Sequence, residues 1–178
     1  LMINYRVNSP KLESNHWSYK SEEGGRLIGE CCHFIDWCNF ITSSAPAKIS
    51  VASVPVENSI LNEENLIINI EYKNGSACSV FYSALGNFKL PKEYIEIYGG
   101  GLIVTIDNFK DGKIIRKDKT EKINLKHQNK GYTEELKNII NAIQTGAPSP
   151  ISLEEIEKTH LSIFKAGESL KTGKIMEI

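Results

Sequence analysis

Four side chains that could take part in chemistry recur at helical spacing near residue 30. Arg26, Glu30, His33 and Trp37 follow one another at steps of four, three and four residues, so on an α-helix they share one stripe. Histidine ionises near neutral pH, and a carboxylate three residues away lies on the same helix face. We therefore predict that His33 and Glu30 exchange a proton with a bound ligand, from a stripe that faces water or a cleft.

The same spacing admits a structural interpretation, which spacing alone favours. In that interpretation His33 forms a hydrogen bond inside the core, and Glu30 pairs with Arg26 one turn away. Asp36 follows His33 by one turn and is a candidate to orient its imidazole, although an Asp on a helix flank is usually solvated or locally paired. The two interpretations differ in whether His33 reaches a cleft.

The segment from Asn8 to Glu23 is rich in Pro, Ser, Asn and charged residues, which is typical of a loop, yet it contains His16 and Trp17. A Trp beside a His in such a loop is suited to contact a ligand. Aromatic side chains that pin a long loop onto the core are the more common case. Both interpretations remain open.

Metal and phosphate sites are poorly supported by the sequence. Cys31, Cys32, Cys38 and Cys78 show no Cys-x-x-Cys spacing and are predicted to be reduced, buried side chains, so a zinc site built on Cys31, Cys32 and His33 is not expected. The glycines at 99–101 follow a predicted strand, but no helix opens after them to bind an anion. We predict no metal and no nucleotide-phosphate site.

The elements that must position these residues are strands and three helices. Residues 25–41 carry apolar residues at helical spacing and predict a largely buried helix. Thr133 begins a second helix, and Ser152 to Glu155 form a capping box that begins a third, which ends at Gly173 with Ile156, Ile163, Phe164 and Leu170 on its apolar face.

Alternating and β-branched segments predict a mostly antiparallel sheet, and hence an α+β fold. Hairpin turns are expected at 73–75, at 99–101 and at Asp111–Gly112. The predicted strands are 1–7, 49–54, 65–72, 76–83, 93–98, 102–107, and two short strands near Lys113 and Glu121.

Composition limits the class of protein. A chain of 178 residues with 40% hydrophobic and 24% charged side chains has the size of one globular domain. Its formal charge of −1 and dispersed basic residues argue against nucleic-acid binding, and no apolar run is long enough to cross a bilayer. We expect a soluble, cytoplasmic protein whose first residues already form a strand, as in a chain that lacks an upstream domain.

The segment from Glu23 to Asp36 resembles the central helix of the glucose-fructose oxidoreductase, inositol dehydrogenase and MocA family. Here, as in that family, a glycine pair opens the helix and a His is followed three residues later by an Asp. Other segments agree in order over nearly the whole chain: Tyr5 to Asn8, His16–Trp17, Ala84 to Gly86, the glycines at 99–101, Lys130 to Tyr132, and the two final helices.

The resemblance implies an open, mainly antiparallel sheet with helices on one face, similar to the C-terminal domain of dihydrodipicolinate reductase, and a second face that packs in a homo-dimer or tetramer. It also implies that His33 faces a sugar or polyol and relays the proton while hydride passes between substrate and NAD or NADP. Residues chosen for substrate contacts are Asn8, His16, Trp17, Arg26 and Tyr132.

Two departures from the family pattern stand out. Many members carry an Asp four residues before the His, where this chain has Gly29 and offers Glu30 one position later. Because one residue turns an α-helix by about 100°, Glu30 is not a simple replacement. The family's Gly-rich nucleotide loop and catalytic Lys belong to an N-terminal Rossmann domain, and no Gly-x-Gly-x-x-Gly occurs in residues 1–178.

The sequence therefore predicts one domain over residues 1–178, the substrate-binding and oligomerisation half of an NAD(P)-dependent oxidoreductase that acts on a sugar-like or polyol substrate. On its own the chain is predicted to be inactive. The alternative is a non-catalytic ligand-binding or assembly module on the same fold, in which the stripe near residue 30 serves packing.

Overall fold

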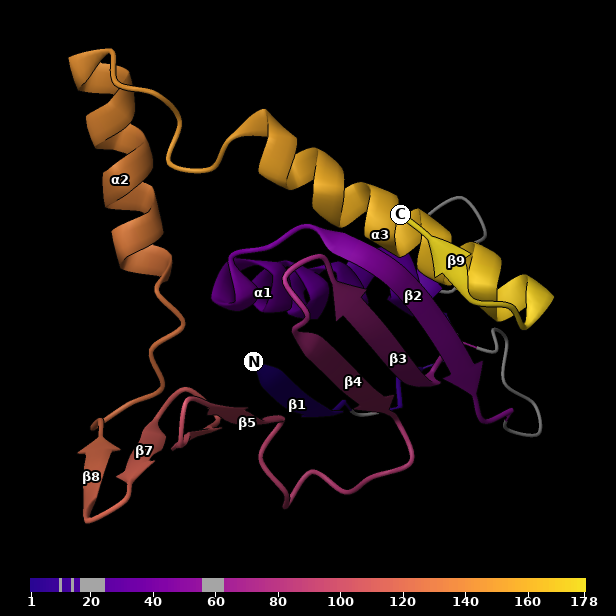
Figure 1. The fold of residues 1–178 in the computed structure, drawn as a ribbon, viewed down its shortest axis with the longest axis horizontal. Helices are drawn as coiled ribbons and strands as arrows, with labels where there is room; N and C mark the ends of the chain where they lie inside the picture. Colours follow the sequence, from indigo (N-terminus) through magenta and orange to yellow (C-terminus); the bar gives the residue numbers. More distant parts are fainter. Residues whose placement is uncertain (10, 14, 17–24, 56–62) are drawn as a thin grey trace.

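The computed structural model contains a single nine-stranded sheet, and it describes residues 1–178 except 10, 14, 17–24 and 56–62. The strands lie in the order β8-β7-β6-β5-β1-β4-β3-β2-β9 (Figure 1). Their bounds are β1 Met2–Asn8, β2 Pro46–Ser53, β3 Asn65–Tyr72, β4 Ala77–Ser83, β5 Glu93–Gly99, β6 Leu102–Asp107, β7 Asp111–Arg116, β8 Lys119–Asn124 and β9 Met176–Glu177.

Strand β1 lies at the centre of the sheet and is the seam between its two halves. It pairs in parallel with β4 and antiparallel with β5, while the other strand pairs are antiparallel. The prediction of an open, mainly antiparallel sheet is confirmed. Gly75, with a φ of 82°, closes the β3–β4 hairpin in a conformation that glycine adopts without steric cost.

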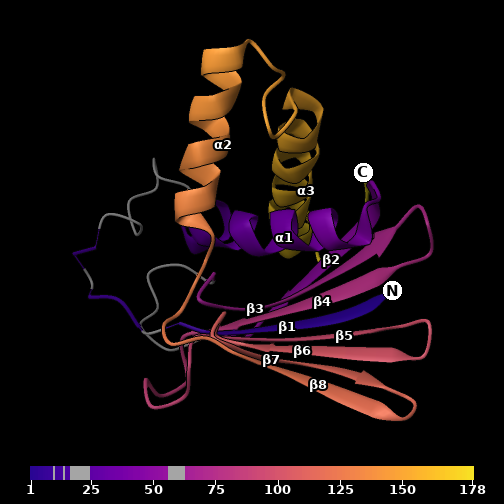
Figure 2. The same cartoon turned by 90° about the vertical axis from the view of Figure 1, so that its left-hand side faces the viewer.

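Helices cover one face of the sheet over β1 to β4 (Figure 2). A π-helical turn, Leu27–Cys31, runs directly into α1, Cys32–Thr42. The long helix α3, Leu153–Thr172, packs on β2 and α1. Helix α2, Tyr132–Thr145, extends away from the sheet, and Ala142 is its only buried residue among those the structure describes. None of the described helices has the length and apolar character needed to cross a membrane.

The core lies between these helices and the inner strands. Its side chains alternate along the strands, as expected for a sheet with one covered face. The residues that are at most 2% exposed include Ile3, Tyr5, Val7, Cys31, Ile35, Cys38, Ile49, Leu66, Ile68, Ile70, Val80, Tyr82, Ile95, Ile163 and Ala166.

The signals at the ends of α3 are confirmed in detail. The Ser152 hydroxyl accepts a hydrogen bond from the Glu155 amide at 3.2 Å, and the Glu155 carboxylate accepts one from the Ser152 amide at 2.9 Å. Gly173 ends the helix in the left-handed conformation. The predicted apolar face is only partly right, because Ile163 is buried whereas Ile156 and Phe164 are 41% and 57% exposed.

Two local predictions are wrong. Asp111 and Gly112 lie inside β7, and the turn falls earlier, where Asn108 and Phe109 have φ values of 51° and 52°. A Cβ on Gly112 would approach the Thr105 carbonyl oxygen to 3.2 Å, so this glycine permits close strand approach and does not make a turn.

The second error concerns the single stripe expected near residue 30. The π-helical turn carries more residues than the 3.6 of an α-turn, so helical steps of four and three do not stay in phase across it. Arg26 is 2% exposed and faces inward, whereas His33 is exposed. The four residues therefore do not share one exposed stripe, because Arg26 points into the protein and His33 points outward.

Candidate functional site

A groove opens where α1 faces the beginnings of α2 and α3. It has a volume of about 770 Å³ and receives His33, Asp36 and Trp37 from α1. Lys130 lines it from the segment just before α2 begins, and Glu135 lines it from the first turn of α2. The remaining lining residues are Asn39, Phe40, Ser43, Ser44, Ala45, Pro150, Ile151, Glu155 and Lys158.

His33 is thus within reach of a cavity, as the catalytic interpretation requires. Its neighbour Asp36 accepts a hydrogen bond from the Thr159 hydroxyl at 2.8 Å, which ties α1 to α3. The groove combines an imidazole, an ammonium group, carboxylates and aromatic rings, a set that suits a ligand with several hydroxyl groups.

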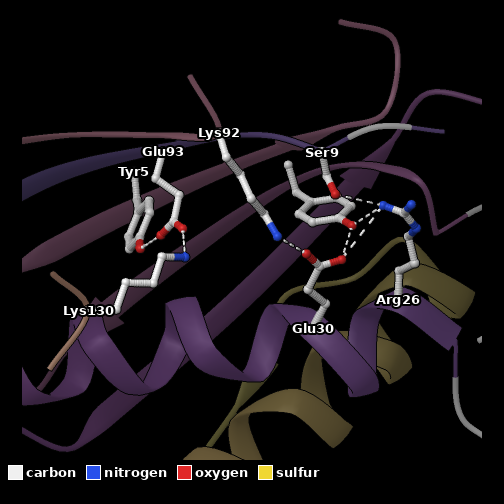
Figure 3. Close-up of polar contacts among 8 residues, drawn as sticks. Tyr5, Ser9, Arg26, Glu30, Lys92, Glu93 and Lys130 are labelled. Atoms are coloured by element: carbon white, nitrogen blue, oxygen red, sulfur yellow. Dashed lines mark hydrogen bonds and ion pairs between the residues drawn. The ribbon is translucent and has the colours of Figure 1, made fainter. Parts of the chain in front are cut away.

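A polar cluster lies between the π-helical turn and the sheet (Figure 3). The Tyr82 hydroxyl donates to Glu30 Oε2 at 2.5 Å and accepts from Arg26 Nη1, which also donates to Ser9 Oγ at 3.0 Å. Lys92 Nζ lies 2.5 Å from Glu30 Oε1. Glu30 and Arg26 are themselves 3.7 Å apart, so the predicted pairing of these two residues is present.

The cluster sets the protonation state of Glu30. Burial raises the pKa of Glu30, but hydrogen bonds from Lys92 and Tyr82, and the charges of Lys92 and Arg26, lower it further than burial raises it, so the net pKa is below its ordinary value. Glu30 is therefore ionised at neutral pH. A carboxylate with a lowered pKa is a weak base, which suits it to hold Lys92 and Arg26 more than to exchange protons.

A second cluster of the same chemical types lies along the helix. The Tyr5 hydroxyl donates to Glu93 Oε2 at 2.5 Å, and Lys130 Nζ binds the other carboxylate oxygen, Glu93 Oε1. Tyr5 and Glu93 are 2% and 3% exposed, whereas Lys130 is 27% exposed. Burial, followed by the hydrogen bond to Glu93, raises the pKa of Tyr5, so its hydroxyl stays protonated and can donate.

The other predicted contact residues that the structure describes belong to different segments of the chain. The Asn8 side-chain nitrogen Nδ2 donates to the carbonyl oxygens of Asn87 and Leu90 at 2.8 and 3.0 Å, which holds the β4–β5 loop. Tyr132 is 67% exposed at the start of α2. His16 is partly buried, and Trp17 lies outside the described residues.

The cysteines do not gather around the imidazole. Cys31 is completely buried and His33 is exposed, although only one residue separates them. Burial raises the pKa of the Cys31 thiol well above its ordinary value. Within the described part of the chain, no three His, Cys, Asp or Glu side chains are placed to hold a metal ion.

Sequence reasoning missed Tyr5, Tyr82, Lys92, Glu93 and Lys130 as members of this region. The alternation along β5 was an available signal, because Glu93 lies on the same inward-facing side of the strand as Ile95 and Ile97. A carboxylate at an inward position requires a partner. That partner is Lys130, 37 residues away, and no local pattern connects the two.

The architecture is a half-covered α+β sheet with a ligand-sized groove at the edge of its helical layer. Residues 1–173 match the family described as "Oxidoreductase family, C-terminal alpha/beta domain". The chain therefore belongs to this oxidoreductase family, as the resemblance of its central helix indicated.

Solved structures show the same fold. An aldose-aldose oxidoreductase from Caulobacter crescentus, in complex with glycerol, is 12% identical with a TM-score of 0.83. An oxidoreductase from Agrobacterium radiobacter, in complex with NAD⁺, L-tartaric acid and magnesium, is 15% identical with a TM-score of 0.78. A UDP-N-acetylglucosamine 3-dehydrogenase from Acidithiobacillus ferrooxidans is 12% identical with a TM-score of 0.78.

These matches cover most of this chain but only part of the other proteins. They include 99%, 99% and 96% of this chain, and 55%, 56% and 53% of the respective structures. The chain thus spans little more than half their length. No match was found among curated proteins.

Proposed function

We propose that this chain is the substrate-binding and oligomerisation domain of an NAD(P)-dependent oxidoreductase that acts on a secondary alcohol or ketone of a sugar-like or polyol substrate. The observation that carries the proposal is the position of His33, which is exposed on the wall of a groove of about 770 Å³ beside Trp37 and Lys130. Family membership supports the reaction class.

His33 acts as the proton relay in this proposal. When the substrate is oxidised, the hydroxyl proton passes to the His33 imidazole while hydride leaves the same carbon for the nicotinamide. His33 is suited to this step because histidine takes up and releases protons near neutral pH. Glu30, the other residue selected for catalysis, contributes by holding Lys92 and Arg26 in place.

Substrate contacts are assigned to Asn8, His16, Trp17, Arg26 and Tyr132. Tyr132 follows the groove residue Lys130 by two positions and is exposed. Arg26 is 2% exposed and bonds to Tyr82 and Glu30, so its role in this proposal is indirect, through the cluster that it holds together. The role of Asn8 in this proposal is to position the β4–β5 loop, which its side chain holds through two hydrogen bonds.

NAD or NADP is the hydride carrier in this proposal, and the triple glycine does not have the geometry of a phosphate loop. The glycines at 99–101 join β5 to β6, two strands, and no helix N-terminus follows them. We propose that a dinucleotide-binding domain joined to this one holds the cofactor. We propose that residues 1–178 alone do not turn over substrate, which a nicotinamide absorbance assay on the purified chain tests.

The proton-relay role is tested by His33→Ala in a protein that includes the dinucleotide-binding domain. Loss of a general acid or base lowers turnover by about 10²-fold to 10⁴-fold. Because His33 is exposed, the variant should fold normally. His160→Ala is the matched control, since His160 is an exposed histidine on α3 whose ring bonds to the Ile156 carbonyl oxygen. A near-normal rate for His33→Ala would favour the non-catalytic assembly module.

The sheet face opposite the helices is the proposed homo-dimer or tetramer interface. Phe81, Ile67 and Tyr98 on this face are 43%, 38% and 40% exposed. Phe81→Glu places a charge in the middle of this face and should convert the oligomer to monomers in light scattering. Phe164→Glu, on the outer side of α3, is the control that should leave the oligomeric state unchanged. The same proposal places the protein in the cytoplasm, which its free cysteines fit.

A further inference from the structure

The lining of the groove includes a cation, Lys130, that is bound by a buried carboxylate. Lys130 lines the groove, and its ammonium group binds Glu93 Oε1. The ammonium also lies 5.8 Å from the centroid of the Phe109 ring, a second favourable contact for a cation. Lys130 is 27% exposed, so part of the side chain remains open to the groove.

The carboxylate that binds Lys130 belongs to Glu93, which is buried. Glu93 is 3% exposed, and burying an ionised carboxylate is unfavourable unless it is paired and hydrogen-bonded. Its two oxygens have one strong partner each, Lys130 and the Tyr5 hydroxyl. The bond from Tyr5 fixes the orientation of the Glu93 carboxylate, and the carboxylate in turn fixes the position of the Lys130 ammonium group.

Tyr5 also contacts a second residue that lines the groove, Trp37. Its ring lies 5.3 Å from the Trp37 ring at an interplanar angle of 79°, an edge-to-face contact, and Trp37 lines the groove. One buried phenol on β1 therefore supports both the aromatic and the cationic groups that face the ligand.

We propose that Lys130 is a ligand-binding residue of the groove, which donates a hydrogen bond to an oxygen of a neutral polyol, and that Glu93 and Tyr5 are the positioning residues that aim it. An ammonium group has three N–H donors, and the bond to Glu93 accounts for one of them. The inference rests on the proposed function, since it assumes that the groove beside His33 is the substrate site.

The test is an NMR titration of the 178-residue chain with myo-inositol and D-glucose as probes, which follows the His33 ring and the amide of Lys130. The wild-type chain should show saturable shifts of both. Lys130→Met should weaken binding by about tenfold or more, because it removes a charged hydrogen-bond donor. Lys130→Arg should restore part of the affinity.

Positioning is tested by Glu93→Gln, which keeps Lys130 but removes its charge partner, and should weaken binding by about threefold to tenfold. Should this variant fail to fold, Tyr5→Phe tests the same alignment by removing only the hydroxyl. Lys165→Met is the matched control, because Lys165 pairs with Glu168 on α3 and does not line the groove. Its binding should equal that of the wild-type chain.

The outcomes separate this inference from the proposed function. If the wild-type chain binds a probe with shifts at His33, and Lys130→Met binds equally well, Lys130 is a structural residue and the proposed function stands. If Lys130→Met weakens binding but Glu93→Gln and Tyr5→Phe do not, the positioning role is wrong. If neither probe moves any resonance of the groove in the wild-type chain, both the groove as a polyol site and the role of Lys130 are wrong.

Discussion

Strands β1 to β4 and strands β5 to β8 have similar lengths and aliphatic content, but helices cover only the first group (Figure 2). Ile68 on β3 and Val80 on β4 are completely buried. On the outer half, Ile114 is only partly buried and Ile123 is 50% exposed. The two halves of one continuous sheet therefore contribute very differently to stability.

The position of the candidate site follows from this difference. Glu93 is the first residue of β5, and Lys130 follows the end of β8, whereas His33 and Trp37 come from the helix over the inner strands. The two polar clusters thus lie where the covered half of the sheet meets the open half, and Lys130 links one of them to the groove. Packed elements hold these polar groups, and the less covered half is left available to other chains or domains.

The largest expected effect is on the inner half. Ile68→Ala removes a completely buried side chain and should lower the free energy of unfolding by about 2–5 kcal/mol, since it combines lost transfer energy with a cavity. Ile123→Ala, at a half-exposed position on β8, should change it by about 0.5 kcal/mol or less. Urea unfolding of both variants measures the contrast, and equal losses would show that another chain covers the outer strands in solution.

A smaller effect on stability is expected in the polar cluster around Glu30. Glu30→Gln weakens the charged hydrogen bonds from Lys92 and Tyr82 and should cost about 1–3 kcal/mol at neutral pH. Because the folded-state pKa of Glu30 lies below its ordinary value of 4.5, the stabilisation is present above that value and is lost as the pH falls through the folded-state pKa.

The measurement for Glu30 is the free energy of unfolding of the wild-type chain and of Glu30→Gln between neutral pH and pH values well below 4.5. The two curves should converge in acid. A difference that stays constant over the whole range would mean that the charge of Glu30 does not stabilise the fold. Glu168→Gln, which breaks an exposed pair with Lys165, is the control and should have little effect at any pH.

The same contrast explains which features could be predicted from the sequence. The bounds 65–72 and 102–107 agree with β3 and β6 because alternation and turn residues are local signals. The capping box at Ser152 is equally local. His33 was selected by type, spacing and family resemblance, and the structure places it in a groove.

The features that escaped prediction depend on contacts distant in sequence or on irregular backbone. The π-helical turn at Leu27–Cys31 has no composition that marks it, yet it turns Arg26 inward and separates it from His33. The pair of Glu93 with Lys130 joins β5 to the segment before α2 across 37 positions. Such pairs become visible only when the strands have been placed in register.

The smallest expected effect is on α2, whose larger aliphatic side chains follow helical spacing but are exposed. Leu136, Ile139, Ile140 and Ile143 are 61%, 40%, 52% and 76% exposed. Ile143→Ser should therefore change the free energy of unfolding of the chain by about 0.5 kcal/mol or less, whereas Ile163→Ser on α3, at a position 1% exposed, should cost several times more. An isolated helix of 14 residues is only marginally stable, so an aliphatic face of this size gains stability when it is covered. A loss for Ile143→Ser that approaches that of Ile163→Ser, and that grows with protein concentration, would show that α2 is buried against a second copy of the chain.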